Sequence, residues 1–244
     1  MMFWENEEIL RAIKAHAMDA YPEEACGLII DDEYVPVENK ADDPLHDFAV
    51  DPALLIRHKV QAIVHSHPDG PNAPTRADME GQLACCIPYG ICAVLGEAKK
   101  PFFWGDGLPA VPLIGREFRH GPSGTDGRGD CYSIVKDYYA QQGVDLPEFP
   151  RDDEWWSNGG NMYENNFAKA GFVEVDVAGD PQPGDLALMR IPPACPVANH
   201  AAVYIGDGLI LHQLFGRLSR REPIGRWPKH IVKWLRRKEV SNHG

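Results

Sequence analysis

The sequence predicts an α/β domain followed by an α+β domain, on three observations. Segments with helical and with strand periodicity alternate as far as residue 104, whereas a helix precedes the strands after residue 130. A Gly- and Pro-rich stretch without sustained periodicity separates the two patterns. The 244 residues also suit two cores of common size. We therefore expect a first domain at residues 1–104, a linker at 105–129 and a second domain at 130–244.

The first domain is expected to begin with an amphipathic helix within residues 1–24. Apolar runs bounded by acidic residues predict strands at 26–31 and 34–39. A short helix at 51–59, a strand at 61–67, a helix beginning near Thr75 and a strand at 89–96 complete the alternation.

The second domain is expected to begin with a helix at 131–143, whose apolar residues fall on one stripe and whose end is marked by Gly143. Residues 155–172 predict a loop leading into a helix closed by Gly171, and residues 181–189 predict a turn into a strand. Residues 200–212 predict a hairpin about the turn residues Gly206, Asp207 and Gly208.

Composition excludes several classes of protein. The 36 acidic residues outnumber the 24 basic ones and give a net charge of −12, which argues against a nucleic-acid binder. No segment is apolar enough for a transmembrane helix, and residues 1–24 lack the pattern of a signal peptide. The six cysteines do not form a disulfide framework, which indicates synthesis in a reducing compartment. Basic residues gather at 217–238, as a solvated face or as a docking surface for an acidic partner.

The stretch "HSHPDGPNAPTRAD" contains a candidate metal site. Alternation along a strand points His65 and His67 to the same side, so both imidazoles can reach one ion. Thr75 is a natural N-cap, which places Asp78 in the first turn of a helix. Two nitrogens and one carboxylate oxygen leave a fourth position for water, the composition of a catalytic zinc site. The alternative is a polar loop without an ion.

An upstream Glu, the His-x-His-Pro run and the spaced Asp together resemble the JAMM (Mov34/MPN/PAD-1) metalloprotease family, over about residues 5–104. The resemblance implies an MPN-like mixed sheet with flanking helices, Zn²⁺ bound by His65, His67 and Asp78, and hydrolysis of a peptide or isopeptide bond. It also implies that Glu24, which we prefer to Glu23, takes a proton from the attacking water. Thr75 stands where the family usually has Ser, a position that helps to stabilise the oxyanion.

A second constellation consists of a thiol and two histidines. Asp130 is a natural N-cap, so Cys131 begins a helix, where backbone N–H groups and the helix dipole are expected to lower the thiol pKa. His200 begins one arm of the expected hairpin and His212 ends the other, so antiparallel pairing brings them together. We expect His200 to be the base that activates the thiol.

The stretches "DCYS", "PGDLALM" and "NHAAVYIGDGLILH" resemble the NlpC/P60 family of papain-like cysteine peptidases, which cut peptidoglycan stem peptides. The resemblance covers about residues 131–234 and implies Cys131 as nucleophile, His200 as general base and His212 as the residue that orients it. Members commonly have Ser-Gly after the cysteine, whereas this chain has Tyr132 and Ser133, which leaves substrate preference open.

The two modules in one chain resemble a family of tail tip proteins of lambda-like bacteriophages. The resemblance implies two peptidase modules, phage tail-tip proteins as partners, synthesis in the host cytoplasm and a place at the virion tail tip, acting on the cell wall. Two alternatives stay open. One is a structural tail component with unused catalytic sites, and the other is an enzyme that removes ubiquitin-like modifiers, which leaves the second module unexplained. Trp155 and Trp156 are expected in the core or along a substrate groove.

Overall fold

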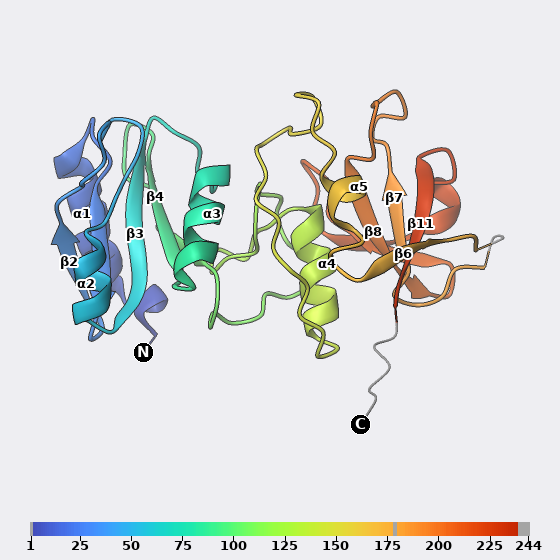
Figure 1. Cartoon of the computed structure of the whole chain (residues 1–244), viewed down its shortest axis with the longest axis horizontal. Helices are drawn as coiled ribbons and strands as arrows, with labels where there is room; N and C mark the ends of the chain where they lie inside the picture. Colours follow the sequence, from blue (N-terminus) through green and yellow to red (C-terminus); the bar gives the residue numbers. More distant parts are fainter. Residues whose placement is uncertain (1, 178–179, 239–244) are drawn as a thin grey trace. The chain divides into compact units, whose positions relative to one another are not determined.

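The computed structural model describes residues 2–177 and 180–238. The chain divides into two compact units (Figure 1). The first contains the residues up to Pro109 together with Gly124–Asp126, and the second contains Ala110–Ser123 and the residues from Gly127 onward.

The first unit is built on a mixed sheet in the order β2-β1-β3-β4-β5. Strands β3 and β4 run parallel, and the other neighbouring pairs are antiparallel. The strands are β1 (Cys26–Ile30), β2 (Glu33–Val37), β3 (Val60–Pro68), β4 (Tyr89–Val94) and β5 (Phe102–Trp104). The helices are the 3-10 turn η1 (Phe3–Glu5), α1 (Glu7–Ala20), α2 (Pro52–Arg57) and α3 (Arg76–Cys85).

Successive side chains along each strand point to opposite faces of this sheet, and both faces pack against helices. Helix α1 packs its apolar stripe, which includes Ile13, on the face that carries Ile29 and Val64. The opposite face carries Leu28 and Ile63 and packs against apolar side chains of α2 and the end of α3. Burial on both faces explains why the inner strands β1 and β4 are apolar throughout, and a mixed sheet with flanking helices confirms the predicted fold of this half.

The second unit has an antiparallel sheet in the order β10-β9-β8-β7-β11-β6. Its helices are α4 (Cys131–Ala140), α5 (Met162–Asn166) and the 3-10 turn η2 (Ile224–Arg226). Its strands are β6 (Phe172–Val175), β7 (Leu186–Met189), β8 (His200–Gly206), β9 (Leu209–His212), β10 (Arg220–Pro223) and β11 (Ile231–Arg237).

Helix α4 lies against this sheet, with Val135 and Tyr139 in one core cluster with Ala201 and Leu188. The predicted hairpin is present as β8 and β9. Its turn residues Gly206, Asp207 and Gly208 all have positive φ, the conformation that glycine adopts without strain and aspartate tolerates. One helix followed by an antiparallel sheet confirms the predicted α+β fold of the second half.

One expectation for the second half is wrong in extent, and two strands of this half were not predicted. The helix expected before Gly171 is confined to Met162–Asn166, because its two asparagines are weak helix formers and the chain turns through Gly171 at φ 82°. The basic run at 217–238 contains two strands, β10 and β11, which the sequence did not predict. Leu235 of β11 is fully buried, so this run includes part of the core.

The basic run also makes ion pairs within the second unit. Lys233 pairs with Glu164 and Glu174, and Arg236 pairs with Asp185. These ion pairs neutralise positive charges that a docking surface for an acidic partner would need. They favour the interpretation of the basic run as a partly solvated face of the second unit.

The Gly- and Pro-rich stretch does not fall wholly between the units. Arg116 is buried and donates to the carbonyl oxygens of Val111 and Pro112 and to the carboxylate of Asp137 in α4. These bonds tie residues 111–116 to the second unit, whereas Gly124–Asp126 lie with the first. The domain limits expected from the sequence stay a prediction.

All six cysteines are free thiols. Within residues 2–177 and 180–238, no helix has the length and apolar character needed to span a bilayer.

Candidate zinc and cysteine sites

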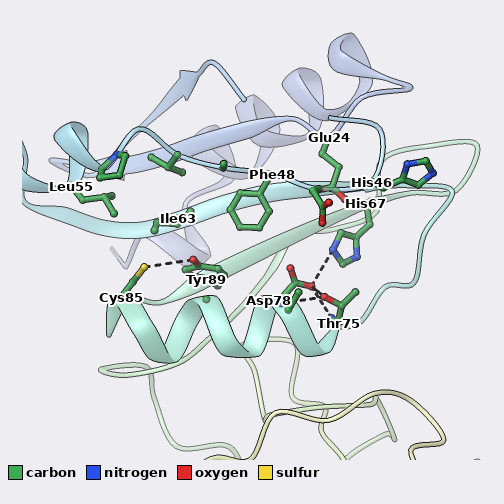
Figure 2. A pocket seen from close by; sticks show the side chains of 16 residues that line it. Glu24, His46, Phe48, Leu55, Ile63, His67, Thr75, Asp78, Cys85 and Tyr89 are labelled. Atoms are coloured by element: carbon green, nitrogen blue, oxygen red, sulfur yellow. Dashed lines mark hydrogen bonds and ion pairs between the residues drawn. The ribbon is translucent and has the colours of Figure 1, made fainter. Parts of the chain in front are cut away.

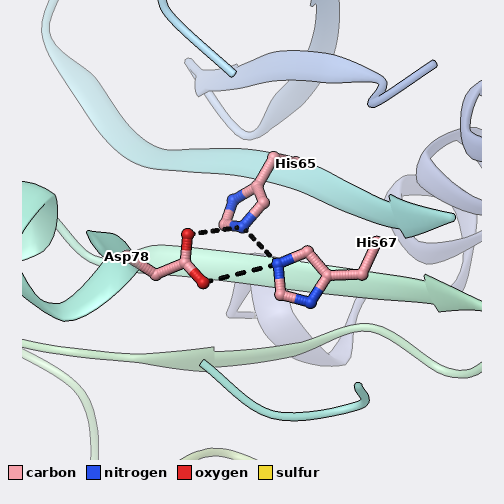
Figure 3. Close-up of side chains that lie close together, drawn as sticks. All are labelled: His65, His67 and Asp78. Atoms are coloured by element: carbon pink, nitrogen blue, oxygen red, sulfur yellow. Dashed lines mark hydrogen bonds and ion pairs between the residues drawn. The ribbon is translucent and has the colours of Figure 1, made fainter. Parts of the chain in front are cut away.

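The two histidines of β3 and the aspartate of α3 meet in the first unit. His65 Nε2 lies 3.0 Å from His67 Nε2 and 3.1 Å from Asp78 Oδ1, and His67 Nε2 lies 3.4 Å from Asp78 Oδ2. Figure 3 shows the three groups converging on one point. All three side chains are buried, and their ligand atoms lie within 4.8 Å of one another. The structure therefore assembles the three groups predicted from the sequence.

The start of α3 places the aspartate. The Thr75 hydroxyl accepts from the backbone N–H of Asp78, and the Thr75 backbone N–H donates to Asp78 Oδ2, which is a capping box. The Thr75 hydroxyl also lies 2.7 Å from Asp78 Oδ2 and donates to it. This bond commits the hydroxyl proton to Asp78, so the oxyanion role that the resemblance implies for Thr75 would require the bond to be released.

The donor set fits a divalent cation. His67 Nδ1 lies 2.8 Å from the carbonyl oxygen of Pro71, which can only accept, so Nδ1 carries a proton and Nε2 of the neutral ring carries the lone pair. That lone pair faces His65 Nε2 and a carboxylate oxygen. Lone pairs converging in a buried place need a cation or a shared proton between them, and two nitrogens with one oxygen suit zinc with an open fourth position.

The charges of His65 and Asp78 agree with a site for a cation, whereas that of His67 favours the shared proton: burial alone would lower the pKa of His67, but Asp78 outweighs it and raises that pKa. Burial lowers the pKa of His65, which favours the neutral imidazole that a metal needs. Burial alone would raise the pKa of Asp78, but the two imidazoles outweigh it and hold that pKa well below its usual range. His65 is also shielded by Phe48, whose ring stacks on it with a centroid distance of 4.0 Å.

Glu24 lies at the same end of a cavity of about 350 Å³ as His67, Thr75 and Asp78 (Figure 2). The neighbouring residue holds it there, because the Ala25 backbone N–H donates to the Ser66 hydroxyl and the Ala25 carbonyl accepts from the Ser66 N–H, between the two histidines. Burial raises the pKa of Glu24 to about 7, whereas Glu23 is exposed. A carboxyl with a pKa near neutrality can accept and return a proton.

Cys131 begins α4 in the second unit, as predicted. Its N-cap is Asp130, whose carboxylate accepts from the Ser133 backbone N–H. The Cys131 Sγ lies 3.1 Å from the hydroxyl of Tyr163 and accepts from the Ala201 backbone N–H. A pair of buried charges holds Asp130 in place, since Arg151 Nε donates to its Oδ2 at 2.7 Å.

The expected lowering of the thiol pKa is wrong. Burial, and then the charge of Asp130, raise the pKa of Cys131 to about 11, and the hydrogen bonds from Tyr163 and Ala201 offset only part of this. The helix terminus is present, but its positive end is balanced by the carboxylate that caps it. The thiol is therefore neutral at rest and needs a base to remove its proton.

The two predicted histidines lie side by side, with His200 Nε2 3.1 Å from His212 Nδ1. His200 and Cys131 line the same cavity of about 120 Å³, together with Trp155 and Trp156. Burial and then the neighbouring His212 keep the pKa of His200 well below its usual value. The structure thus brings Cys131, His200 and His212 to one place, and the tryptophan pair both lines the cavity and packs on the core.

Comparison with known proteins agrees with both halves. Residues 115–236 match the NlpC/P60 family, and residues 6–104 match the prokaryotic homologs of the JAB domain. The tail tip assembly protein K of Escherichia phage N15 is 31% identical over 251 residues, which cover 98% of each chain. The chain belongs to the tail tip assembly protein K family. Both domain families predicted from the sequence are confirmed.

A second member of the tail tip assembly protein K family, from Escherichia phage lambda, is 36% identical over 180 residues, 73% of this chain and 79% of that one. The solved structure of NlpC1 from Trichomonas vaginalis is 21% identical and covers 51% of this chain and 39% of that chain, with a TM-score of 0.36.

Two residues of the cysteine site in this member of the tail tip assembly protein K family were not predicted from the sequence. Tyr163 contacts Cys131 from the short helix α5, and Glu222 faces His212 from β10. Neither stands in a motif, and β10 was not predicted as a strand. The register that pairs Arg220 with His212 places Glu222 on the same face of the sheet, and only the folded chain contains that information.

Proposed function

We propose that this chain is a phage tail-tip protein with two peptidase modules: a cysteine endopeptidase that cuts peptidoglycan stem peptides and a zinc-dependent peptidase or isopeptidase. The observation that carries the proposal is the cavity lined by Cys131 and His200, with His212 directly behind His200. The names of the two relatives, which state tail tip assembly, support the location at the tail tip.

In the cysteine module, His200 takes the proton of the Cys131 thiol, and the resulting thiolate attacks the carbonyl carbon of the scissile peptide bond. The C–N bond then breaks, the amine leaves with the proton from His200, and a thioester remains on Cys131. Water hydrolyses the thioester after giving a proton to His200, which returns it to the sulfur. His212 keeps the His200 ring in place through the bond between Nε2 and Nδ1.

In the first module, His65, His67 and Asp78 would hold the zinc ion. When bound, the ion would supply a Lewis acid that polarises the scissile carbonyl and lowers the pKa of water. Glu24 accepts the proton of the attacking water on a carboxylate oxygen and passes it to the leaving amine, a role for which a pKa of about 7 is suited. Thr75 orients Asp78 through the capping box.

The proposed partners are other tail-tip proteins, with stem peptides as the substrate of the second module. We place synthesis in the host cytoplasm and action at the virion tail tip on the cell wall. The acidic composition, with a net charge of −12, supports protein and peptide partners over nucleic acid.

A synthetic stem tetrapeptide tests the cysteine module, with the products identified by mass spectrometry. The intact chain should cut one peptide bond, Cys131→Ser should abolish cutting, and His65→Ala should leave it unchanged. Cutting that survives Cys131→Ser would contradict the assignment of the nucleophile.

The alternative is a structural tail-tip component whose catalytic sites are unused. The relatives' names favour it in one respect, because they state assembly and no catalysis. Absence of cleavage by folded, thiol-intact protein on both synthetic and polymeric substrates would support this alternative.

A further inference from the structure

We propose that Glu222 is a positioning residue that fixes the tautomers of His212 and His200 and so leaves His200 Nδ1 free to take the Cys131 proton. The inference rests on the proposed cysteine peptidase function and adds a fourth residue to it. The chain of groups runs from β10 through β9 to β8, three neighbouring strands of one sheet.

Glu222 is buried, at 5% exposure, and its carboxylate is held from two sides. The Trp227 indole N–H donates to Oε2 at 3.1 Å, and Arg220 pairs with Oε1. The same Oε2 lies 3.6 Å from His212 Nε2, and the Trp227 ring meets the His212 ring edge-on at 5.1 Å. A carboxylate fixed in this way presents an acceptor to His212 and has no freedom to turn away.

The tautomers follow from donors and acceptors. Within the described part of the chain, His212 Nε2 is buried without a hydrogen-bond partner inside 3.5 Å, and the Glu222 carboxylate oxygen at 3.6 Å is the acceptor that it faces. A lone pair there would face a carboxylate oxygen at close range, so Nε2 carries the proton and points it at Glu222. In the neutral ring, His212 Nδ1 is then an acceptor.

The second ring follows from the first. His212 Nδ1 lies 3.1 Å from His200 Nε2, so His200 Nε2 must carry the proton that this bond needs. His200 Nδ1 is left with a lone pair, which is the state required of a base that removes a thiol proton. Burial, the largest influence, lowers the pKa of His212 to about 4, in agreement with a neutral ring at pH 7.

The alternative is that Glu222 has only a structural role, as the ion-pair partner of Arg220, and this alternative makes a different prediction. If the carboxylate only held β10, its loss would lower the stability of the fold without changing which nitrogen of His212 carries the proton. A spectroscopic readout of the two rings therefore separates positioning from structural support.

The test is ¹⁵N NMR of histidine-labelled intact protein at pH 7.5, with the two rings assigned by single substitution. The expected spectrum shows both His200 and His212 as Nε2–H tautomers. His212 as the Nδ1–H tautomer, or as a charged ring, would overturn the proposal.

The companion test is the alkylation rate of Cys131 with iodoacetamide, followed peptide by peptide so that exposed Cys86 serves as the internal reference. Glu222→Ala should slow Cys131 by about tenfold or more, as for loss of a residue that orients a catalytic histidine. It should not change the rate of Cys86. Glu174→Gln, which removes an exposed partner of Lys233, is the matched control and should change neither rate.

Glu222→Gln keeps the size of the side chain and guards against loss of the fold in Glu222→Ala. Glu222→Gln should keep the tautomers, because its amide oxygen can still accept from His212 Nε2–H. Unchanged tautomers and an unchanged Cys131 rate in folded Glu222→Ala would refute the positioning role. Neither measurement uses a substrate, so failure of this inference is distinct from failure of the proposed peptidase activity.

Discussion

Two buried aspartates at helix starts organise the two sites. Asp78 lies in the first turn of α3 and accepts from Thr75, and Asp130 caps α4 and accepts from Arg151. A buried carboxylate is costly unless it is fully hydrogen-bonded, so each aspartate fixes the groups around it. In the first unit these groups are the two histidines, and in the second they are the arginine and the first turn of the helix that carries Cys131.

Zinc content tests the first site at the residue level. Protein purified without added metal should contain about one zinc per chain, because three ligands converge in a buried place. His65→Ala should lose most of this metal, as measured by mass spectrometry of the elements. The matched control is His58→Ala, an exposed histidine of the same unit, and equal metal loss in both variants would contradict the site.

The pH dependence of Cys131 alkylation tests the neutral thiol. The thiolate is the reactive form, and a pKa of about 11 means that its fraction rises throughout the range from pH 7 to pH 10. The rate should therefore climb with pH over this whole range, as followed by mass spectrometry. A plateau below pH 8 would show a preformed thiolate and contradict the account.

At the level of elements, the start of α3 links stability to the metal site. Thr75→Ala removes the side chain that closes the capping box, and the free energy of unfolding should fall by about 1 kcal/mol, the usual value of such a cap. Thr75→Ser keeps the hydroxyl and should lose less than half of this. Thermal unfolding of the three proteins gives the comparison, and equal stability of the Ala and Ser variants would contradict it.

The start of α4 depends on a buried ion pair. Asp130→Asn removes one of the two buried carboxylates that pair with Arg151, while Glu148 still pairs with its Nη1, and should cost about 1–3 kcal/mol. Glu117→Gln, at an exposed pair with Arg128, should cost under about 1 kcal/mol. Urea unfolding measures both, and similar small losses would show that the buried pair does not hold the helix.

The same pair gives a dependence on pH. Burial opposes ionisation of Asp130, but Arg151 outweighs it and lowers the pKa of the carboxyl below its ordinary value. The contribution to stability is thus complete above about pH 4 and is lost as the pH falls through the lower, folded-state pKa. Asp130→Asn should remove this part of the acid dependence.

The elements that the sequence predicts best are those with a local cause. The hairpin from His200 to His212 follows from its Gly-Asp-Gly turn, and α4 follows from its cap and apolar stripe. Strand β10 was missed because its residues are polar and it forms by pairing with β9. Glu222 was missed with it, and the raised pKa of Cys131 could not be predicted because burial depends on the complete fold.

At the level of the whole molecule, each unit has its own sheet, its own core and its own set of chemical groups. The order of the two modules and the fold class were predicted from the sequence. Each module carries a motif that lies among segments with clear helical or strand periodicity. The division of residues 105–129 between the units was not predicted. It depends on contacts between residues far apart in sequence, such as the bond from Arg116 to the Asp137 carboxylate within the second unit.

The most direct measurement is release of soluble muropeptides from purified peptidoglycan by the intact protein, beside Cys131→Ala and His65→Ala. We expect release by the intact protein and by His65→Ala, and none by Cys131→Ala, because the Cys131 thiol is the nucleophile of the second module. Equal release by the intact protein and Cys131→Ala, or no release by any of the three, would contradict a cysteine-dependent wall peptidase.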